Sequence, residues 1–310
     1  NSDLIEDFSL YKSNIPIDFG GQLSSLFDIK AKKGNTGEFS ARGGISPISS
    51  RFMAEGPIKK GKSSYLVGGR ATYSNWLLGL INEVNIQNSS ASFADGFIKL
   101  YSSPDTLNKI SFVAYGSTDK TDLAFDVNNE YNNIGAGFTW THYFNEMHHA
   151  NFNIVHSNYN FDKRNTEVVT KASKYNFAIN HTELKADFHY NKFTNHAFRY
   201  GLNSVYYNVY DGKLLPLNDL SRITPYESKR EKALKNSIFF GDRWDINSNL
   251  TIDFGLRGTV YSYLGPATIY NYRPGMPRNE FNIKDTTTYS INSFVKNYPG
   301  LDYRFAAKYS

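Results

Sequence analysis

Three histidines lie close enough in the sequence to suggest a metal site. They are His142, His148 and His149, and imidazole nitrogens are common zinc ligands. No carboxylate stands at a useful spacing from them, so histidines beside a turn are the better interpretation. The chain has no cysteine, which excludes a thiolate metal site and a disulfide framework.

Four carboxylates earlier in the chain could bind calcium through their oxygen atoms: Asp119, Asp122, Asp126 and Glu130. Their spacing does not match an EF-hand loop, and nothing there supplies its central glycine. Catalysis would need a convergent set of groups, and no clustered Ser, His and Asp or acidic site is visible. We therefore predict no metal site, no cofactor and no enzymatic activity.

The net charge of +5 is spread along the chain rather than gathered on one segment. The short basic cluster at Lys59, Lys60 and Lys62 fits a solvated turn. Nucleic-acid binding would need a basic face, so we predict no nucleic-acid partner.

The composition is polar overall yet rich in aromatic residues. Among 310 residues are 23 Tyr and 23 Phe, and the mean hydropathy is -0.50. No stretch approaches the roughly 18 apolar residues of a membrane helix. A membrane barrel has no such run either, because each of its strands turns every second residue to lipid. The composition therefore leaves a soluble β-protein or a membrane β-barrel.

The elements that must position these residues are β-strands with two different faces. In the segment 250–259, Leu250, Ile252, Phe254 and Leu256 alternate with polar or small residues. About twelve segments show this alternation of apolar and polar residues, and no segment has the convincing pattern of an amphipathic helix. The predicted strands are 37–46, 50–58, 63–74, 91–102, 109–120, 134–141, 149–162, 184–191, 197–210, 232–246, 250–259 and 303–310.

Strand and loop lengths favour the membrane barrel. Most of the predicted strands have at least the roughly nine residues that a tilted membrane strand needs. After a first tight link at 47–49, short links alternate with long ones, as periplasmic turns and extracellular loops do. The short links are 59–62, 104–107, 145–147 and 247–249, and the long ones are 75–90, 121–130, 163–174, 211–231 and 264–302.

Two further sets of residues are candidates for contacts. The polar faces of the strands carry charges that we interpret mainly as contacts with the barrel lumen or its plug, rather than with substrate: Arg70, Lys185, Asp187, Asp253 and Arg257. The longest loop carries Tyr270, Tyr272 and Arg273, which suit contacts with a sugar, a peptide or a partner. The residue types of that loop are equally those of an ordinary exposed turn.

The segment 10–30 resembles the end of the plug domain in TonB-dependent outer-membrane receptors. Pro16 and Gly20-Gly21 are followed by Ser24-Ser25 and Asp28, as in the segment that leads from the plug to the first barrel strand in that family. Glycines permit the sharp turn this needs. A glycine common in the family is replaced here at 13–14.

The resemblance implies an all-β fold, a transmembrane antiparallel barrel of about 22 strands, of which about twelve lie in this chain. Residues 1–36 would be the C-terminal end of the plug, and 37–310 the N-terminal half of the barrel, with sequence missing on both sides. The implied function is TonB-dependent uptake of a bulky nutrient across the bacterial outer membrane. The alternative is a non-transporting scaffold or anchor in a larger outer-membrane complex.

The resemblance also implies the partners. They would be outer-membrane lipid, the TonB complex of the inner membrane, reached through segments outside this chain, and other outer-membrane subunits. The Asn-, Lys- and Tyr-rich composition is similar to that of receptors from Bacteroidetes. Many of those are SusC-like and pair with a surface lipoprotein.

Overall fold

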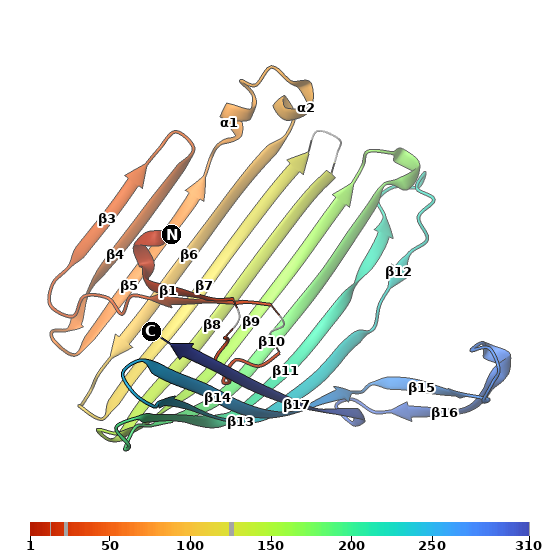
Figure 1. Cartoon of the computed structure of the whole chain (residues 1–310). Helices are drawn as coiled ribbons and strands as arrows, with labels where there is room; N and C mark the ends of the chain where they lie inside the picture. The colour runs from red at the N-terminus through yellow and green to blue at the C-terminus, as the bar shows by residue number, and fades with distance from the viewer. Residues whose placement is uncertain (13, 22–23, 124–126, 310) are drawn as a thin grey trace.

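A curved antiparallel sheet makes up most of the chain (Figure 1). The computed structural model describes residues 1–12, 14–21, 24–123 and 127–309. Neighbours in the sequence are neighbours in the sheet from β3 to β11, and β13, β14 and β17 follow, with β12 beside β11. The strands are β3 (Ser40–Ile45), β4 (Ser49–Lys59), β5 (Ser63–Thr72), β6 (Ser90–Ser102), β7 (Asn108–Leu123), β8 (Val127–Asn145), β9 (His148–Asn165), β10 (Ser173–Tyr190), β11 (His196–Pro216), β12 (Tyr226–Glu227), β13 (Arg230–Asp245), β14 (Leu250–Leu264) and β17 (Phe294–Tyr309).

A small hairpin lies against the concave side of this sheet (Figure 1). It consists of η1 (Ser2–Leu4), β1 (Ile5–Tyr11) and β2 (Leu26–Ala31). Leu4 packs with Met53 of β4 and Leu66 of β5 in a small buried apolar cluster. The loop at 14–21, which we call the plug loop, contacts β10, β11, β14 and β17 toward the other end of the sheet. We call residues 1–36 the plug tail, after the expectation from the sequence, and the face that they contact the inner face.

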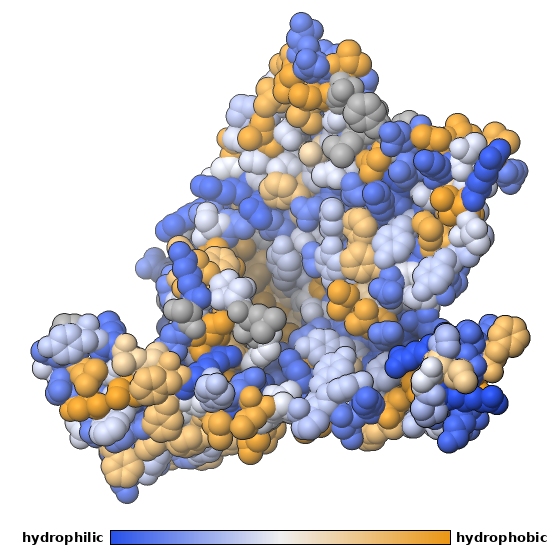
Figure 2. Space-filling view, turned by 45° about the vertical axis from the view of Figure 1, so that its right-hand side comes forward, coloured by the Kyte–Doolittle hydropathy of each residue, from blue (hydrophilic) through white to orange (hydrophobic). Residues whose placement is uncertain are grey.

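The predicted alternation of faces is confirmed in the strand 250–259. Phe254 and Leu256 are exposed on the convex outer face, whereas Gly255 and Arg257 are buried on the inner face. Ile134, Leu202 and Ile238 are exposed in the same way on neighbouring strands. Figure 2 shows the molecule hollowed on its concave side, with hydrophilic residues around much of the opening. The apolar surface therefore faces outward, as in a barrel surrounded by lipid.

Aromatic side chains gather on the outer face near the short turns. Trp140 stacks on Phe152 with ring centroids 5.1 Å apart, and Phe188 stacks on Tyr200 at 5.2 Å. Such girdles mark the membrane interface of barrels. Across the described residues, no helix is long and apolar enough to cross a membrane.

All twelve predicted strands exist, but two predicted long loops, 121–130 and 264–302, consist largely of strand. Strand β7 runs to Leu123 and β8 begins at Val127, so most of the predicted loop 121–130 is strand, and 124–126 lie outside the described residues. Residues 127–133 are polar at nearly every position, which hides the alternation. The predicted loop 264–302 also contains a hairpin of β15 (Ala267–Tyr272) and β16 (Ile283–Tyr289), with η3 (Glu280–Asn282) between them.

Short helices occur in two of the predicted loops. The loop at 75–90 contains α1 (Asn75–Leu78) and α2 (Val84–Gln87), and the loop at 163–174 contains η2 (Val169–Lys171). Figure 1 shows α1 and α2 above β5 and β6, at the same end of the sheet as the other long loops.

Candidate functional site

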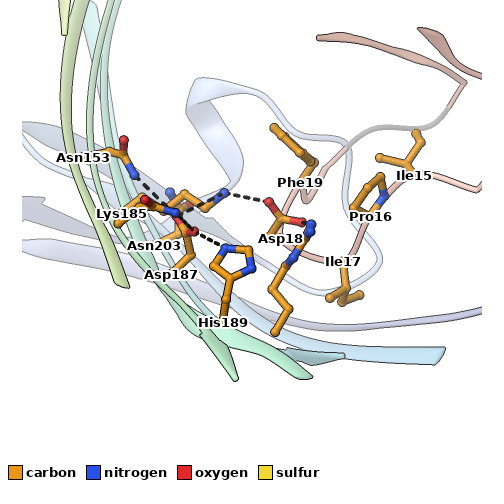
Figure 3. Close-up of polar contacts among 12 residues, drawn as sticks. Ile15, Pro16, Ile17, Asp18, Phe19, Asn153, Lys185, Asp187, His189 and Asn203 are labelled. Atoms are coloured by element: carbon orange, nitrogen blue, oxygen red, sulfur yellow. Dashed lines mark hydrogen bonds and ion pairs between the residues drawn. The ribbon is translucent and has the colours of Figure 1, made fainter. Parts of the chain in front are cut away.

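The plug tail crosses the lumen. Its loop at 14–21 is held to the wall through the carboxylate of Asp18, which lies between two cations. Asp18 accepts a hydrogen bond from Lys185 Nζ at 2.9 Å and one from Arg199 Nη1 at 2.8 Å (Figure 3). Lys185 lies on β10 and Arg199 on β11, and the strand register brings both to the inner face. The Asp18 side chain is only 8% exposed, so this is a largely buried ionic contact.

Two arginines hold the backbone of the same loop. Arg257 Nη1 donates to the carbonyls of Ile17 and Asp18, each at 3.3 Å. Arg304 Nη2 donates to the carbonyl of Phe19 at 2.6 Å, and its Nη1 donates to the carbonyls of Ile15 and Pro16. Buried carbonyls need such partners when no secondary structure supplies them. The loop is therefore fastened to β14 and β17 by its main chain.

A second layer of polar side chains supports these cations. Asp187 accepts hydrogen bonds from Asn151 Nδ2 at 2.9 Å and lies 2.9 Å from His189 Nε2. It also lies 4.0 Å from Lys185 Nζ. These donors satisfy the carboxylate of Asp187, whose side chain is buried. The network fixes Lys185 where Asp18 meets it.

The ionisation of Asp18 makes this contact pH-dependent. Burial raises its pKa, but the charges of Lys185 and Arg199 outweigh burial, so the pKa lies below its ordinary value of 3.8. A lowered carboxyl pKa adds stability that is present above the ordinary value and is lost as the pH falls through the lowered one. We expect the loop to stay bound from neutral pH to about pH 5 and to loosen below about pH 4.

The mobility of a spin label on a Ser24→Cys variant, followed during acidification, measures this release. An Asp18→Asn variant carrying the same label is the control, and it should show no transition in that range. A transition centred well above pH 5 would assign the pH dependence to another group.

Glycines make room for the plug loop on the barrel wall. A methyl group on Gly255 would lie 2.7 Å from Cβ of Ile17, and one on Gly20 would overlap the guanidinium of Arg257. Such distances force the neighbouring groups apart. The glycine of the plug motif therefore admits the arginine that holds the loop.

We expect Gly255→Ala to displace Ile17 and weaken loop binding by about 1–3 kcal/mol, because a packed contact has no room for an added methyl group. Gly258→Ala is the matched control, since a methyl group there would meet Ile238 at an ordinary 3.8 Å. Hydrogen exchange of the amides at 17–19 measures both. Equal exchange in the two variants would contradict the close packing of Ile17.

Two hollows flank the loop. One, of about 500 Å³, is lined by Ile17, Asp253 and Arg304 among other residues. The other, of about 330 Å³, is lined by Phe19, Tyr207 and Lys235 among others, and it lies nearer the long loops. The plug loop thus separates a space on the turn side of the lumen from a space on the loop side.

The structure brings together some predicted site residues and leaves others apart. Lys185, Arg257, Pro16 and Gly20 meet at the plug loop, Asp187 supports Lys185, and Asp253 lines the hollow on the turn side. Arg70 lies elsewhere and pairs with Asp95 of β6.

The remaining predicted residues lie outside this group. Gly21 has a φ of 75°, Ser24 and Ser25 are exposed before β2, and Asp28 pairs with Ser9 within the hairpin. The loop candidates lie in the β15–β16 hairpin, Tyr270 and Tyr272 on β15 and Arg273 directly after it, and their role in contacts stays a prediction.

Sequence reasoning missed Asp18, Arg199 and Arg304. Asp18 lies within the segment 10–30 that resembles the end of a plug, but the resemblance did not distinguish it from its neighbours. Arg304 stands between Tyr303 and Phe305, which are exposed on the outer face, so alternation places it on the inner face. The same parity would have assigned Arg199 to the inner face beside Lys185.

The metal candidates do not come together. His142 and His148 lie on the outer face, where His148 Nε2 is 3.1 Å from Tyr200, whereas His149 stacks on His189 on the inner face. Within the described ranges, no group of three His, Asp or Glu side chains could hold an ion. Glu130 pairs with Lys120 at 3.3 Å, and Asp126 lies outside the described residues.

Comparison with known proteins gives similarity at the level of structure. No protein-family model and no curated protein matches the sequence. The copper transporter OprC superposes with a TM-score of 0.68 at 10% identity, over 98% of this chain and 48% of that one. The ferric-catecholate import receptor Fiu of E. coli K12, in its open form, gives 0.63 at 10%, over 99% and 56%.

A third neighbour is the ferripyoverdine receptor of the outer membrane of Pseudomonas aeruginosa, with ferripyoverdine bound. It gives a TM-score of 0.63 at 12% identity, over 97% of this chain and 45% of that one. The fold is that of an outer-membrane receptor barrel. The predicted fold class is thereby confirmed, with the sheet open between its edge strands β3 and β17. The chain spans about half the length of these receptors.

Proposed function

We propose that this chain belongs to a TonB-dependent transporter of the bacterial outer membrane, which imports a bulky nutrient without covalent chemistry. In this proposal residues 1–36 are the C-terminal end of the plug, and 37–310 are the N-terminal half of the barrel. The outward apolar face and the aromatic rows near the turns support placement in a membrane.

The observation that carries the proposal is the way the plug loop is held across the concave face of the sheet. The plug loop is bound to the wall by hydrogen bonds and ion pairs from Lys185, Arg199, Arg257 and Arg304. Water and new polar partners can replace such contacts, whereas displacing a large apolar core would expose its whole surface to water. These polar contacts therefore support a plug that can be moved, as transport requires.

The proposed partner that moves the plug is the TonB complex of the inner membrane. The proposal of a SusC-like subtype, with a surface lipoprotein over the long loops, rests on the Asn-, Lys- and Tyr-rich composition. Co-purification of a lipoprotein with the protein from native outer membranes would support that subtype.

The names of the structural neighbours indicate which cargo to test first. They mention copper, a ferric catecholate and ferripyoverdine. Metal chelates are bulky polar complexes that suit a wide polar lumen, so we propose them as the first class of compound to assay.

Uptake of radiolabelled iron, offered as a panel of ferric chelates to cells that express the protein, tests the proposal. We expect uptake of at least one chelate to stop when the proton-motive force is dissipated, while binding to the cell surface persists. Uptake that continues at the same rate in de-energised cells would show a passive pore and overturn the proposal. Binding without energised uptake of any chelate would overturn the proposed cargo.

A further inference from the structure

The link between β5 and β6 exposes an unusual number of large apolar side chains. Leu80 is 70% exposed and Val84 69%, and four more share the link: Trp76, Leu77, Ile81 and Ile86. Glu83 is the single charged residue between positions 71 and 94. Hydrophobic side chains gather near the top of Figure 2, where α1 and α2 form the highest point of Figure 1.

Hydrogen bonds fix this link to the barrel. Trp76 Nε1 donates to the carbonyl of Pro47 at 2.9 Å, and the Tyr73 hydroxyl donates to the carbonyl of Ser46 at 2.6 Å. At the other end, the backbone N–H of Ala91 donates to Asn75 Oδ1 at 3.0 Å. The apolar side chains are thus presented by a supported surface.

The exposed surface continues the outer face of the barrel. Met53 and Leu66 point inward to the plug tail, so the alternating Phe52 points outward, and it is half exposed. Ser50, two residues before Phe52 and on the same face, donates to the Tyr73 hydroxyl at 2.9 Å. Apolar surface therefore runs from the outer face of β4 through Tyr73 to Trp76 and the helices.

Strand lengths place this link close to the membrane surface. Strands β4 and β5 have 11 and 10 residues, about the number that a tilted strand needs to cross the hydrocarbon core. Strands β8 to β11 have 18 to 21 residues and carry their loops well beyond it. The link after β5 accordingly leaves the barrel where the membrane ends.

We infer that residues 73–89 form an interfacial anchor that dips into the outer surface of the lipid bilayer beside β3, β4 and β5. The inference rests on the proposed membrane placement. Tyr and Trp are enriched at the level of the headgroups, which suits Tyr73 and Trp76, and leucines on short helices enter the boundary with the acyl chains. With Glu83 as its single charged residue, the segment carries little of the charge that would make insertion costly.

Quenching by brominated phospholipids tests the anchor. The chain has no cysteine, so Leu80→Cys provides one attachment point for a bimane label in the protein reconstituted into liposomes. Ile238→Cys is the lipid control, because Ile238 is 69% exposed on the outer face, and Phe281→Cys is the water control, because Phe281 is 90% exposed near the tip of the β15–β16 hairpin. Lipids brominated near the headgroup and near the chain end separate shallow from deep positions.

We expect the label at position 80 to lose about half of its fluorescence with the shallow quencher and less with the deep one. The label at 281 should keep its fluorescence with both. Quenching at 238 without quenching at 80 would overturn the anchor and leave the membrane placement intact. Absence of quenching at 238 would overturn that placement itself. A label at 80 that neither brominated lipid nor aqueous iodide quenches would show a protein cover, which also overturns the lipid assignment.

Discussion

Replacement of Asp18 by alanine is expected to detach the far point of the plug tail from the barrel wall. The change removes the shared partner of Lys185 and Arg199 and leaves the largely buried ammonium of Lys185 with Asp187, 4.0 Å away, as its remaining carboxylate. Removing one partner of a buried ion pair typically costs about 3–5 kcal/mol. Arg199 is partly exposed, so we expect about 3 kcal/mol, at the lower end of that range.

Hydrogen exchange of the amides at 17–19 measures the detachment as faster exchange in the variant. Asp7→Ala is the matched control, because it removes the same side chain from the exposed side of β1 in the same plug tail. A double variant, Asp18→Ala with Lys185→Met, should recover part of the loss by removing the unpaired charge. Unchanged exchange in Asp18→Ala would mean that the arginine contacts to the main chain hold the loop alone.

Phe254→Arg is expected to reduce assembly of the barrel in membranes much more than Thr251→Arg. Phe254 is exposed on the outer face, where a guanidinium turned to lipid costs about 2–4 kcal/mol near the midplane. Thr251 stands on the opposite face near a turn, and its hydroxyl donates to Asp245 at 2.6 Å. An arginine there can keep a partner in Asp245 and in water.

The fraction of folded protein in isolated membranes, read from the difference in gel mobility between heated and unheated samples, measures the effect. Both variants introduce an arginine on β14, three residues apart and on opposite faces. Equal losses would contradict the assignment of the two faces.

The sequence predicted the sheet wherever one face of a strand is apolar. In 250–259 the alternation of Leu, Ile and Phe with polar residues identified both the strand and its outward face. At 127–133 amides and charges occupy both faces, so this end of β8 was missed. In 173–183 the apolar residues Tyr175, Phe177 and Ile179 stand on the face of β10 that carries Lys185, opposite to the face of Leu184, and this end of β10 was missed as well. There the neighbouring strands supply the order through backbone pairing, which leaves no mark on side-chain polarity.

The candidate site was predicted in part for a related reason. Lys185 and Arg257 were found because their own strands alternate. The loop that they hold lies at the other end of the sequence, and nothing local in the segment 14–21 indicates that Asp18 meets β10 and β11. Periodicity assigns a residue to a face but does not name its partner across a lumen.

The fastening of the plug loop has a consequence for the order of assembly. Arg304 binds the carbonyl of Ile15 across 289 residues of chain. Contacts of such separation form late, because the chain between them must first be ordered. While β17 is unplaced, the carbonyls of Ile15, Pro16 and Phe19 lack their donor in Arg304. Attachment of the plug loop at this point therefore follows the pairing of β17 with β14, and it reports that β17 has reached its register.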